Sequence, residues 1–191
     1  MIRAGLLLAA GHSRRFGTDD KLLGDLHGKP LVAHAAEAVR LAGLDVLLAV
    51  AEEPKVAEAL PGFTIVAPGA GRPSHSASLM AGVARAEALG AERLLVVLGD
   101  MPWVTPTLLR AVIARTSAAQ PAAVTDGARR SSPACWPRAR FDALRALTGD
   151  TGARALLSQI PEAALVRTTA SALADIDTAD ELRLARERPP A

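Results

Sequence analysis

Short, continuous apolar runs alternate along this chain with segments whose apolar residues recur at helical spacing. The apolar runs occupy residues 2–9, 45–50, 63–67, 93–98, 122–125 and 164–168. Because they lack polar alternation, they are typical of strands that helices cover on both faces. Strands that alternate with helices predict β-α-β units and a mainly parallel sheet. The expected fold class is therefore α/β, an open Rossmann-like sheet flanked by helices.

Proline, glycine and capping residues mark where the helices begin and end. The expected helices start at or just after Pro30, Ser76, Thr105, Gly152 and Thr178. Gly43 and Gly90 end the first two. Ser76 is the expected N-cap of the second helix. The last start is the clearest, because Thr178 and Glu181 form a capping box in which each side chain satisfies a free main-chain N–H group.

Length and composition limit the number of domains and the classes of partner. The chain has 191 residues, of which 50% are hydrophobic, enough for one substantial core. We expect a single domain over residues 1–188 and a tail at 189–191. A net charge of +2 and an aromatic content of 3% argue against nucleic acid as a partner. No apolar stretch reaches the roughly 20 residues that span a bilayer, so no membrane partner is expected.

The cysteine content and the first residues bear on the cellular compartment. Cys135 is the only cysteine, so the chain forms no intrachain disulfide. The first apolar run passes into charged residues without a convincing signal-peptide cleavage site. Both features favour a cytoplasmic location.

The first apolar run leads directly into a loop that is rich in glycine and positive charge. The stretch "LLLAAGHSRRFGTDDK" contains Gly11, Gly17, Arg14, Arg15 and Lys21. Glycines allow successive main-chain N–H groups to face an anion, and cationic side chains complete such a site. The spacing matches neither a Walker loop nor a dinucleotide-binding fingerprint. From residue types alone, a polyphosphate site and a solvated basic loop fit this segment equally well.

Carboxylates follow the fourth apolar run and precede the last helix. Asp100, in "GDMP", stands at the carboxyl edge of the expected sheet, where ligands of such folds bind. In the extended segment "DIDT", Asp175 and Asp177 point to one side and Ile176 points to the core. Mg²⁺ is usually held by one or two carboxylates and substrate phosphates. We therefore expect Asp100 to bind Mg²⁺ with Asp177, since Thr178 already caps the helix; turn and capping roles are the alternative.

Taken in order, these motifs resemble one family. "LAAGHSRRFGTDDK" is similar to the LAAGxSxRxG…K signature of nucleotidyltransferases related to the molybdenum cofactor guanylyl- and cytidylyltransferases. "GKPLVAHAAEAV", "GDMP", "GDTGARALL" and "DIDTADEL" resemble later segments of that family, so the resemblance extends over residues 8–182. It implies transfer of a nucleoside monophosphate from CTP or GTP to the terminal phosphate of the molybdopterin cofactor, with release of pyrophosphate.

The resemblance also implies roles for particular residues. The nucleotide would contact Leu8, Ala9, Ala10, Gly11, Arg15, Lys21 and Ser78. Arg15 and Lys21 would stabilise charge on the α-phosphate and on the leaving pyrophosphate. Asp100 and Asp177 would hold Mg²⁺, which makes Arg15, Lys21 and Asp100 the expected catalytic residues. No side-chain nucleophile is needed, because the acceptor phosphate itself attacks in line.

The base of the donor nucleotide is the finer expectation. Guanylyl members of the family generally have LAGG where this chain has "LAAG", and the Cβ of Ala10 narrows the space for a purine. The asparagine and aspartate that guanylyl members place after the second and third strands are also missing. The spacing of "GTDDK", in contrast, resembles guanylyl members equally well. CTP is therefore the expected donor and GTP the alternative.

The acceptor half of the chain is less specific. Relatives carry a Gly-His-Pro-like segment near the acceptor pocket, where this chain has "SSPACWP". Trp103, Trp136 and His75 are expected to pack in the core or lie at the surface. A nucleotidyltransferase for another phosphorylated acceptor thus remains an alternative. So does a non-enzymatic carrier that passes the cofactor to a molybdenum hydroxylase or its insertion chaperone, although a carrier has no use for Lys21 paired with Asp100.

Overall fold

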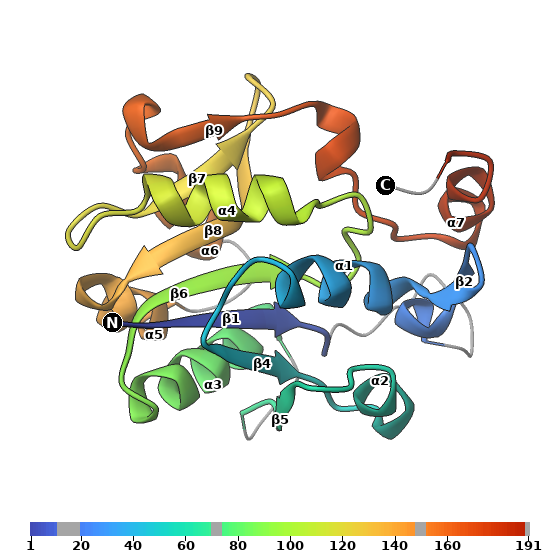
Figure 1. Cartoon of the computed structure of the whole chain (residues 1–191), viewed down its shortest axis with the longest axis horizontal. Helices are drawn as coiled ribbons and strands as arrows, with labels where there is room; N and C mark the ends of the chain where they lie inside the picture. The colour runs from blue at the N-terminus through green and yellow to red at the C-terminus, as the bar shows by residue number, and fades with distance from the viewer. Residues whose placement is uncertain (11–19, 70–73, 148–151, 190–191) are drawn as a thin grey trace.

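A computed structural model describes residues 1–10, 20–69, 74–147 and 152–189 of the chain. These residues form a seven-stranded sheet of order β5-β4-β1-β6-β8-β7-β9 and a small β2-β3 hairpin (Figure 1). The strands are β1 (Ile2–Leu8), β2 (Asp25–Leu26), β3 (Lys29–Pro30), β4 (Val46–Val50), β5 (Thr64–Val66), β6 (Ala91–Leu98), β7 (Ala122–Thr125), β8 (Arg130–Pro137) and β9 (Leu165–Arg167). The predicted α/β class is confirmed.

Helices cover both faces of the sheet. They are α1 (Leu31–Arg40), α2 (Pro54–Glu58), α3 (His75–Ala88), α4 (Pro106–Arg115), α5 (Phe141–Arg145), α6 (Gly152–Ser158) and α7 (Ala179–Ala185). Short 3-10 turns lie at η1 (Lys21–Leu23), η2 (Arg138–Arg140), η3 (Glu162–Ala164) and η4 (Ala170–Leu173). Among the described residues, no helix is both long and apolar enough to cross a membrane.

The central strands are apolar without interruption because each of their faces is buried. Leu7 of β1 belongs to a core under α1, α2 and α4, whereas Leu6 belongs to a second core under α3, α5 and α6. Both side chains are 0% exposed. Figure 1 shows α1 and α4 in front of the sheet. Successive residues of a strand point to opposite faces, so a strand covered on both sides needs no polar alternation.

Close packing brings α3 against the first strand. A Cβ atom on Gly82 would lie 2.4 Å from Cδ2 of Leu6, so only glycine permits this approach without displacement. The start of α3 differs from the prediction. Ser74, not Ser76, is the N-cap, since its hydroxyl accepts from the N–H of Ala77 at 3.1 Å and Ser76 lies inside the helix. At α7, the predicted capping box of Thr178 and Glu181 is confirmed.

Strand β8 was not expected from the sequence. It runs antiparallel between β6 and β7, while β1 pairs in parallel with β4 and β6. The ladder between β7 and β8 pairs Ser131 and Ala134 with consecutive residues of β7, so its register shifts at the intervening Ser132 and Pro133. A proline lacks the N–H group that a ladder needs, and it is tolerated at such an irregularity. Proline and serines in this segment hide the strand pattern.

Candidate active site

Lys21, Asp100 and Asp177 are remote in sequence and meet at the carboxyl edge of the sheet. The Nζ atom of Lys21 donates to Oδ2 of Asp100 and to Oδ1 of Asp177, each at 2.7 Å. Lys21 begins η1, whose preceding residue Asp20 accepts from the N–H of Leu22 at 2.9 Å. Asp100 follows β6 and Asp177 precedes α7. The structure thus brings together the three charged residues that the sequence analysis singled out on separate segments.

Burial and charge act in opposite directions on the ammonium group. Lys21 is only 8% exposed. Burial alone lowers the pKa of Lys21, but the charge of Asp100 and the hydrogen bonds to both carboxylates outweigh it, so this pKa lies above its ordinary value of 10.5. One ammonium group faces two carboxylates, which leaves negative charge in excess. Oδ1 of Asp100 is buried and, among the described residues, accepts no hydrogen bond.

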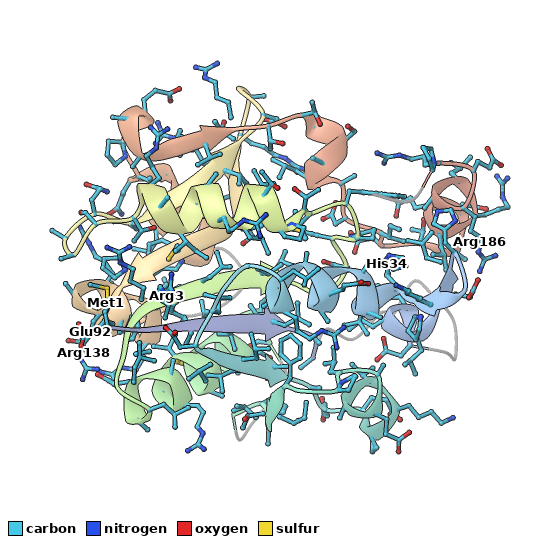
Figure 2. All side chains as sticks on the ribbon, in the orientation of Figure 1. Met1, Arg3, His34, Glu92, Arg138 and Arg186 are labelled. Carbon is cyan, nitrogen blue, oxygen red and sulfur yellow. The ribbon has the colours of Figure 1, made fainter. Side chains whose placement is uncertain are left out.

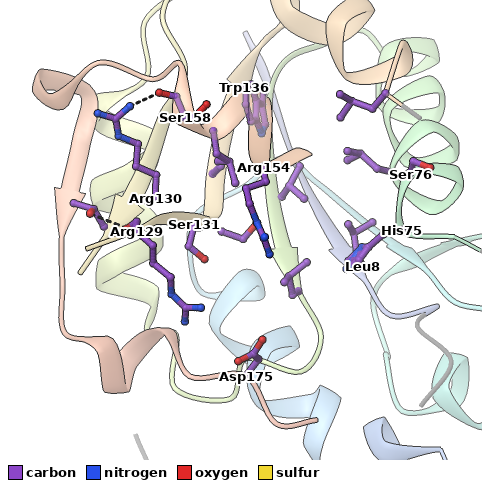
Figure 3. A pocket seen from close by; sticks show the side chains of 18 of the residues that line it. Leu8, His75, Ser76, Arg129, Arg130, Ser131, Trp136, Arg154, Ser158 and Asp175 are labelled. Atoms are coloured by element: carbon purple, nitrogen blue, oxygen red, sulfur yellow. Dashed lines mark hydrogen bonds between the residues drawn. The ribbon is translucent and has the colours of Figure 1, made fainter. Parts of the chain in front are cut away.

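A cavity of about 940 Å³ opens at the same edge of the sheet (Figure 3). Leu8 and Leu98, at the ends of β1 and β6, lie on its wall. The chain reverses its strand order between β1 and β6, and ligands of open α/β sheets bind at such a reversal. His75 and Ser76 of α3 and Trp136 of β8 also line the cavity.

Arginines form one wall of this cavity. Arg130 donates to the carbonyl oxygen of Ser158 and lies 3.9 Å from a carboxylate oxygen of Glu162. Arg129 pairs with Asp126, with Nε 3.7 Å from the carboxylate oxygen Oδ2. Arg154 projects from α6 into the cavity (Figure 3) and has no hydrogen-bond or ion-pair partner within the described ranges. Arg154 is therefore the cation on this wall that can bind an anionic group without breaking an existing contact.

The remaining predicted site residues divide into several groups. Gly11 and Arg15 lie outside the described residues. Leu8 lines the cavity, whereas the N–H group of Ala9 is already bound to the carbonyl oxygen of Val50 at 2.9 Å. Ala10, at the end of the first described range, is partly exposed.

In α3 and in the segment before α7, the residues that line the cavity differ from those predicted from the sequence. Ser78 is 4% exposed and does not line the cavity, whereas Ser76 and His75 do. Asp175 lines the cavity and Asp177 binds Lys21, so the two aspartates of "DIDT" have different surroundings. Sequence reasoning assigned no role to Arg154, although the residue stands inside the quoted motif "GDTGARALL".

An open, mainly parallel sheet with a cation, two carboxylates and a large cavity at its strand-order reversal defines a nucleotide-binding α/β protein. Residues 5–165 match the MobA-like NTP transferase domain, and the chain belongs to this family. It is 35% identical over 140 residues to the molybdenum cofactor guanylyltransferase of Acidiphilium cryptum, covering 73% of this chain and 69% of that protein.

Solved structures agree over nearly the whole chain. Rv0371c of Mycobacterium tuberculosis H37Rv superposes with a TM-score of 0.84 at 26% identity, covering 98% of each chain. Its complex with manganese superposes with a TM-score of 0.82 at 26% identity, covering 99% of this chain and 100% of that one. The chain is accordingly an enzyme of the nucleotidyltransferase class.

Proposed function

We propose that this enzyme transfers CMP from CTP to the terminal phosphate of the molybdopterin cofactor, with release of pyrophosphate and dependence on Mg²⁺. The observation that carries the proposal is Lys21, buried between Asp100 and Asp177 at the edge of the sheet where the large cavity opens. The product would pass in the cytoplasm to a molybdenum hydroxylase or its insertion chaperone.

The Lys21 ammonium group is positioned to bind a phosphate oxygen. An ammonium group has three N–H donors, and contacts to Asp100 and Asp177 use two of them. The third donor is available to an oxygen of the nucleotide. Because both carboxylates fix the lysine before substrate arrives, no reorganisation is needed as charge develops on the leaving pyrophosphate. We propose that Arg15 of the basic loop adds a second cation there.

The donor set suits a divalent cation. Asp100 has a buried oxygen without a described partner, and the two carboxylates of Asp100 and Asp177 leave an excess of negative charge around Lys21. Within the described ranges no group of three or more His, Cys, Asp or Glu side chains could hold a metal, so substrate phosphates would supply further ligands. Asp100 and Asp177 would hold Mg²⁺. Such an ion stabilises negative charge on the phosphates.

The cavity suits an acceptor that has a flat ring and a phosphate. Apolar side chains, including Leu8, Leu98 and Trp136, line one part of the cavity, and polar and charged side chains line the rest. Arg154 has free donors that can bind phosphate in a bidentate manner. We propose that Arg154 binds the terminal phosphate of the acceptor. Ser78 is buried in α3 and does not line the cavity, so any effect of Ser78 on nucleotide binding would come from the position of α3 and not from a contact in the cavity.

Two donors have separate support. Ala10 favours CTP, because its Cβ restricts the space for a purine. GTP is the second candidate, since the chain is 35% identical to a molybdenum cofactor guanylyltransferase over 140 residues.

A nucleotide panel tests the reaction and the donor together. CTP, GTP, ATP and UTP are each supplied with Mg²⁺ and molybdopterin, and pyrophosphate and the dinucleotide product are measured. We expect release with CTP to exceed release with GTP. A preference for GTP would transfer the assignment to the second candidate. Tight binding of the finished dinucleotide without any pyrophosphate release would indicate a cofactor carrier and overturn the proposed reaction.

A further inference from the structure

The main chain around Asp177 is held by a contact beyond an ordinary capping box. Oε2 of Glu181 accepts from the N–H of Thr178 at 2.8 Å, which is the capping interaction. The same oxygen also accepts from the N–H of Asp177 at 2.7 Å. The Thr178 hydroxyl completes the box by accepting from the N–H of Glu181 at 3.2 Å. One carboxylate therefore fixes two successive peptide groups, and one of them belongs to the residue that binds Lys21.

The residue before Asp177 is fixed as well. Ile176 is 2% exposed, and its N–H donates to the carbonyl oxygen of Asp100 at 3.0 Å. Its side chain belongs to a small cluster, here called the edge core, that consists of Leu26, Leu31, Trp103, Ile176, Leu182 and Ala185. The edge core takes residues from each of the segments that carry Lys21, Asp100 and Asp177. Its packing thus connects the three segments independently of their charged side chains.

The end of α7 is anchored against the same segments. Nε of Arg186 donates to the carbonyl oxygen of Asp25 at 2.9 Å, and Figure 2 shows Arg186 beside the β2-β3 hairpin. The guanidinium carbon of Arg188 lies 4.1 Å from the ring centroid of Trp103. The contacts of Ile176 before α7, and of Arg186 and Arg188 after it, therefore fix the helix that carries Glu181. Glu181 is a fixed support for the peptide groups that it binds.

Asp177 depends on this support more than Asp100 does. The side chain of Asp177 is 49% exposed, compared with 20% for Asp100. An exposed carboxylate in an extended segment has many rotamers and backbone states, and its ion pair alone restricts them weakly. We propose that Glu181 is a positioning residue: by fixing the main chain of Asp177, it holds the Asp177 carboxylate against Lys21 in the arrangement that nucleotidyl transfer needs. The catalytic part of this inference rests on the proposed function.

Three single variants separate positioning from helix stability. Glu181→Ala removes the acceptor, and Glu181→Gln retains an oxygen that can accept both N–H groups. Asp180→Ala is the matched control, because Asp180 lies on the same helix turn, its side chain is 92% exposed, and it lies 4.0 Å from Arg183. We expect amide hydrogen exchange at Asp177 and Thr178 to accelerate at least about 10-fold in Glu181→Ala, and to stay near wild type in the other two.

Turnover then shows whether Glu181 acts through Asp177. We expect Glu181→Ala to lower kcat about 10-fold to 100-fold, as small misplacements of reacting groups do, and Glu181→Gln to restore most of it. Adding Glu181→Ala to Asp177→Ala should cause no further loss, because residues that act through one another are not additive. Independent, multiplying losses would overturn the proposal, and so would unchanged exchange at Asp177. Hydrogen exchange is measured without nucleotide, so it tests the positioning role of Glu181 whether or not the chain transfers a nucleotide. Absence of nucleotidyl transfer by the wild-type chain would overturn the proposed function instead.

Discussion

The Nζ atom of Lys21 lies 2.7 Å from Oδ2 of Asp100, although 79 positions separate the two residues in the chain. Both side chains are largely buried, with exposed fractions of 10% and 20%. A buried ion pair of this kind is costly to break from one side, because the remaining charge is left without a partner. Substitutions at the pair should therefore affect activity and stability to different extents, and conservative variants can separate the two.

Lys21→Ala is expected to reduce kcat by about 10²-fold or more, the loss seen when one preorganised donor to developing charge is removed. It also leaves two carboxylates facing each other, so the free energy of unfolding should fall. Lys21→Arg keeps the charge and should recover stability more than turnover, since a planar guanidinium cannot place its donors as an ammonium does. Single-turnover rates and urea unfolding measure the two effects. A wild-type kcat in Lys21→Ala would remove Lys21 from the reaction.

Asp100→Ala is expected to abolish metal-dependent turnover while the far-ultraviolet circular dichroism spectrum stays that of the native chain. The physical reason is the loss of the buried oxygen that no described residue satisfies. Binding of Mn²⁺ in the presence of nucleotide, followed by electron paramagnetic resonance, gives a readout apart from activity. Unfolding of Asp100→Ala together with normal metal binding by Asp100→Asn would show that the carboxylate is structural.

Arg154→Ala should raise the KM for the acceptor about 10-fold to 150-fold, because a hydrogen bond to a charged group contributes roughly 1.5–3 kcal/mol. The KM for the nucleotide should change little. Arg85→Ala is the control, since Arg85 is an exposed arginine of α3 that does not line the cavity. Equal effects on both substrates would place Arg154 on the nucleotide rather than on the acceptor.

The buried thiol of Cys135 makes the free energy of unfolding decrease at alkaline pH. Burial raises the pKa of the Cys135 thiol from 9.0 to about 11, against a weaker opposing effect of the hydrogen bond with Thr116. The unfolded chain loses this proton near pH 9.0 and the folded chain only near pH 11, so the contribution to stability is complete below pH 9.0 and is lost as pH rises to about 11. The chain has no tyrosine to titrate in this range.

Unfolding in urea between pH 8 and pH 11 measures this effect. The thiol should lower the free energy of unfolding above pH 9.0 by at most about 1.4 kcal/mol per pH unit. Cys135→Ala should show a flatter profile over the same range. Identical profiles for the variant and the wild type would exclude the thiol as the cause.

The sheet could be predicted from the sequence because each buried parallel strand shows a local pattern that the fold preserves. Strand β8 could not, since its pairing with β6 and β7 is set by distant residues and Pro133 interrupts its own pattern. The predicted N-cap of α3, Ser76, was wrong by two residues, since the structure has Ser74 there. Either hydroxyl can cap a helix, and tertiary packing decides which one does.

The candidate site shows the same division. Asp100 and Asp177 were identifiable from their positions at a strand end and before a helix, and Lys21 from the glycine-rich basic loop. That Lys21 binds both carboxylates is a relation between distant segments, which no local pattern contains. Arg154 was missed because an arginine in a short helix looks like a solvated surface residue, and only the cavity in front of it distinguishes it.

Strand β8 runs against its neighbours, so its first residues reach the edge where the parallel strands finish. Arg130 and Ser131 thereby contribute to the cavity from a hairpin whose turn is closed locally, with Thr125 Oγ1 donating to the carbonyl oxygen of Arg129 at 2.8 Å. This turn shares no residue with Lys21, Asp100 or Asp177. Evolution or design can therefore lengthen or recode the hairpin to suit a new acceptor and leave the phosphate-transfer machinery intact.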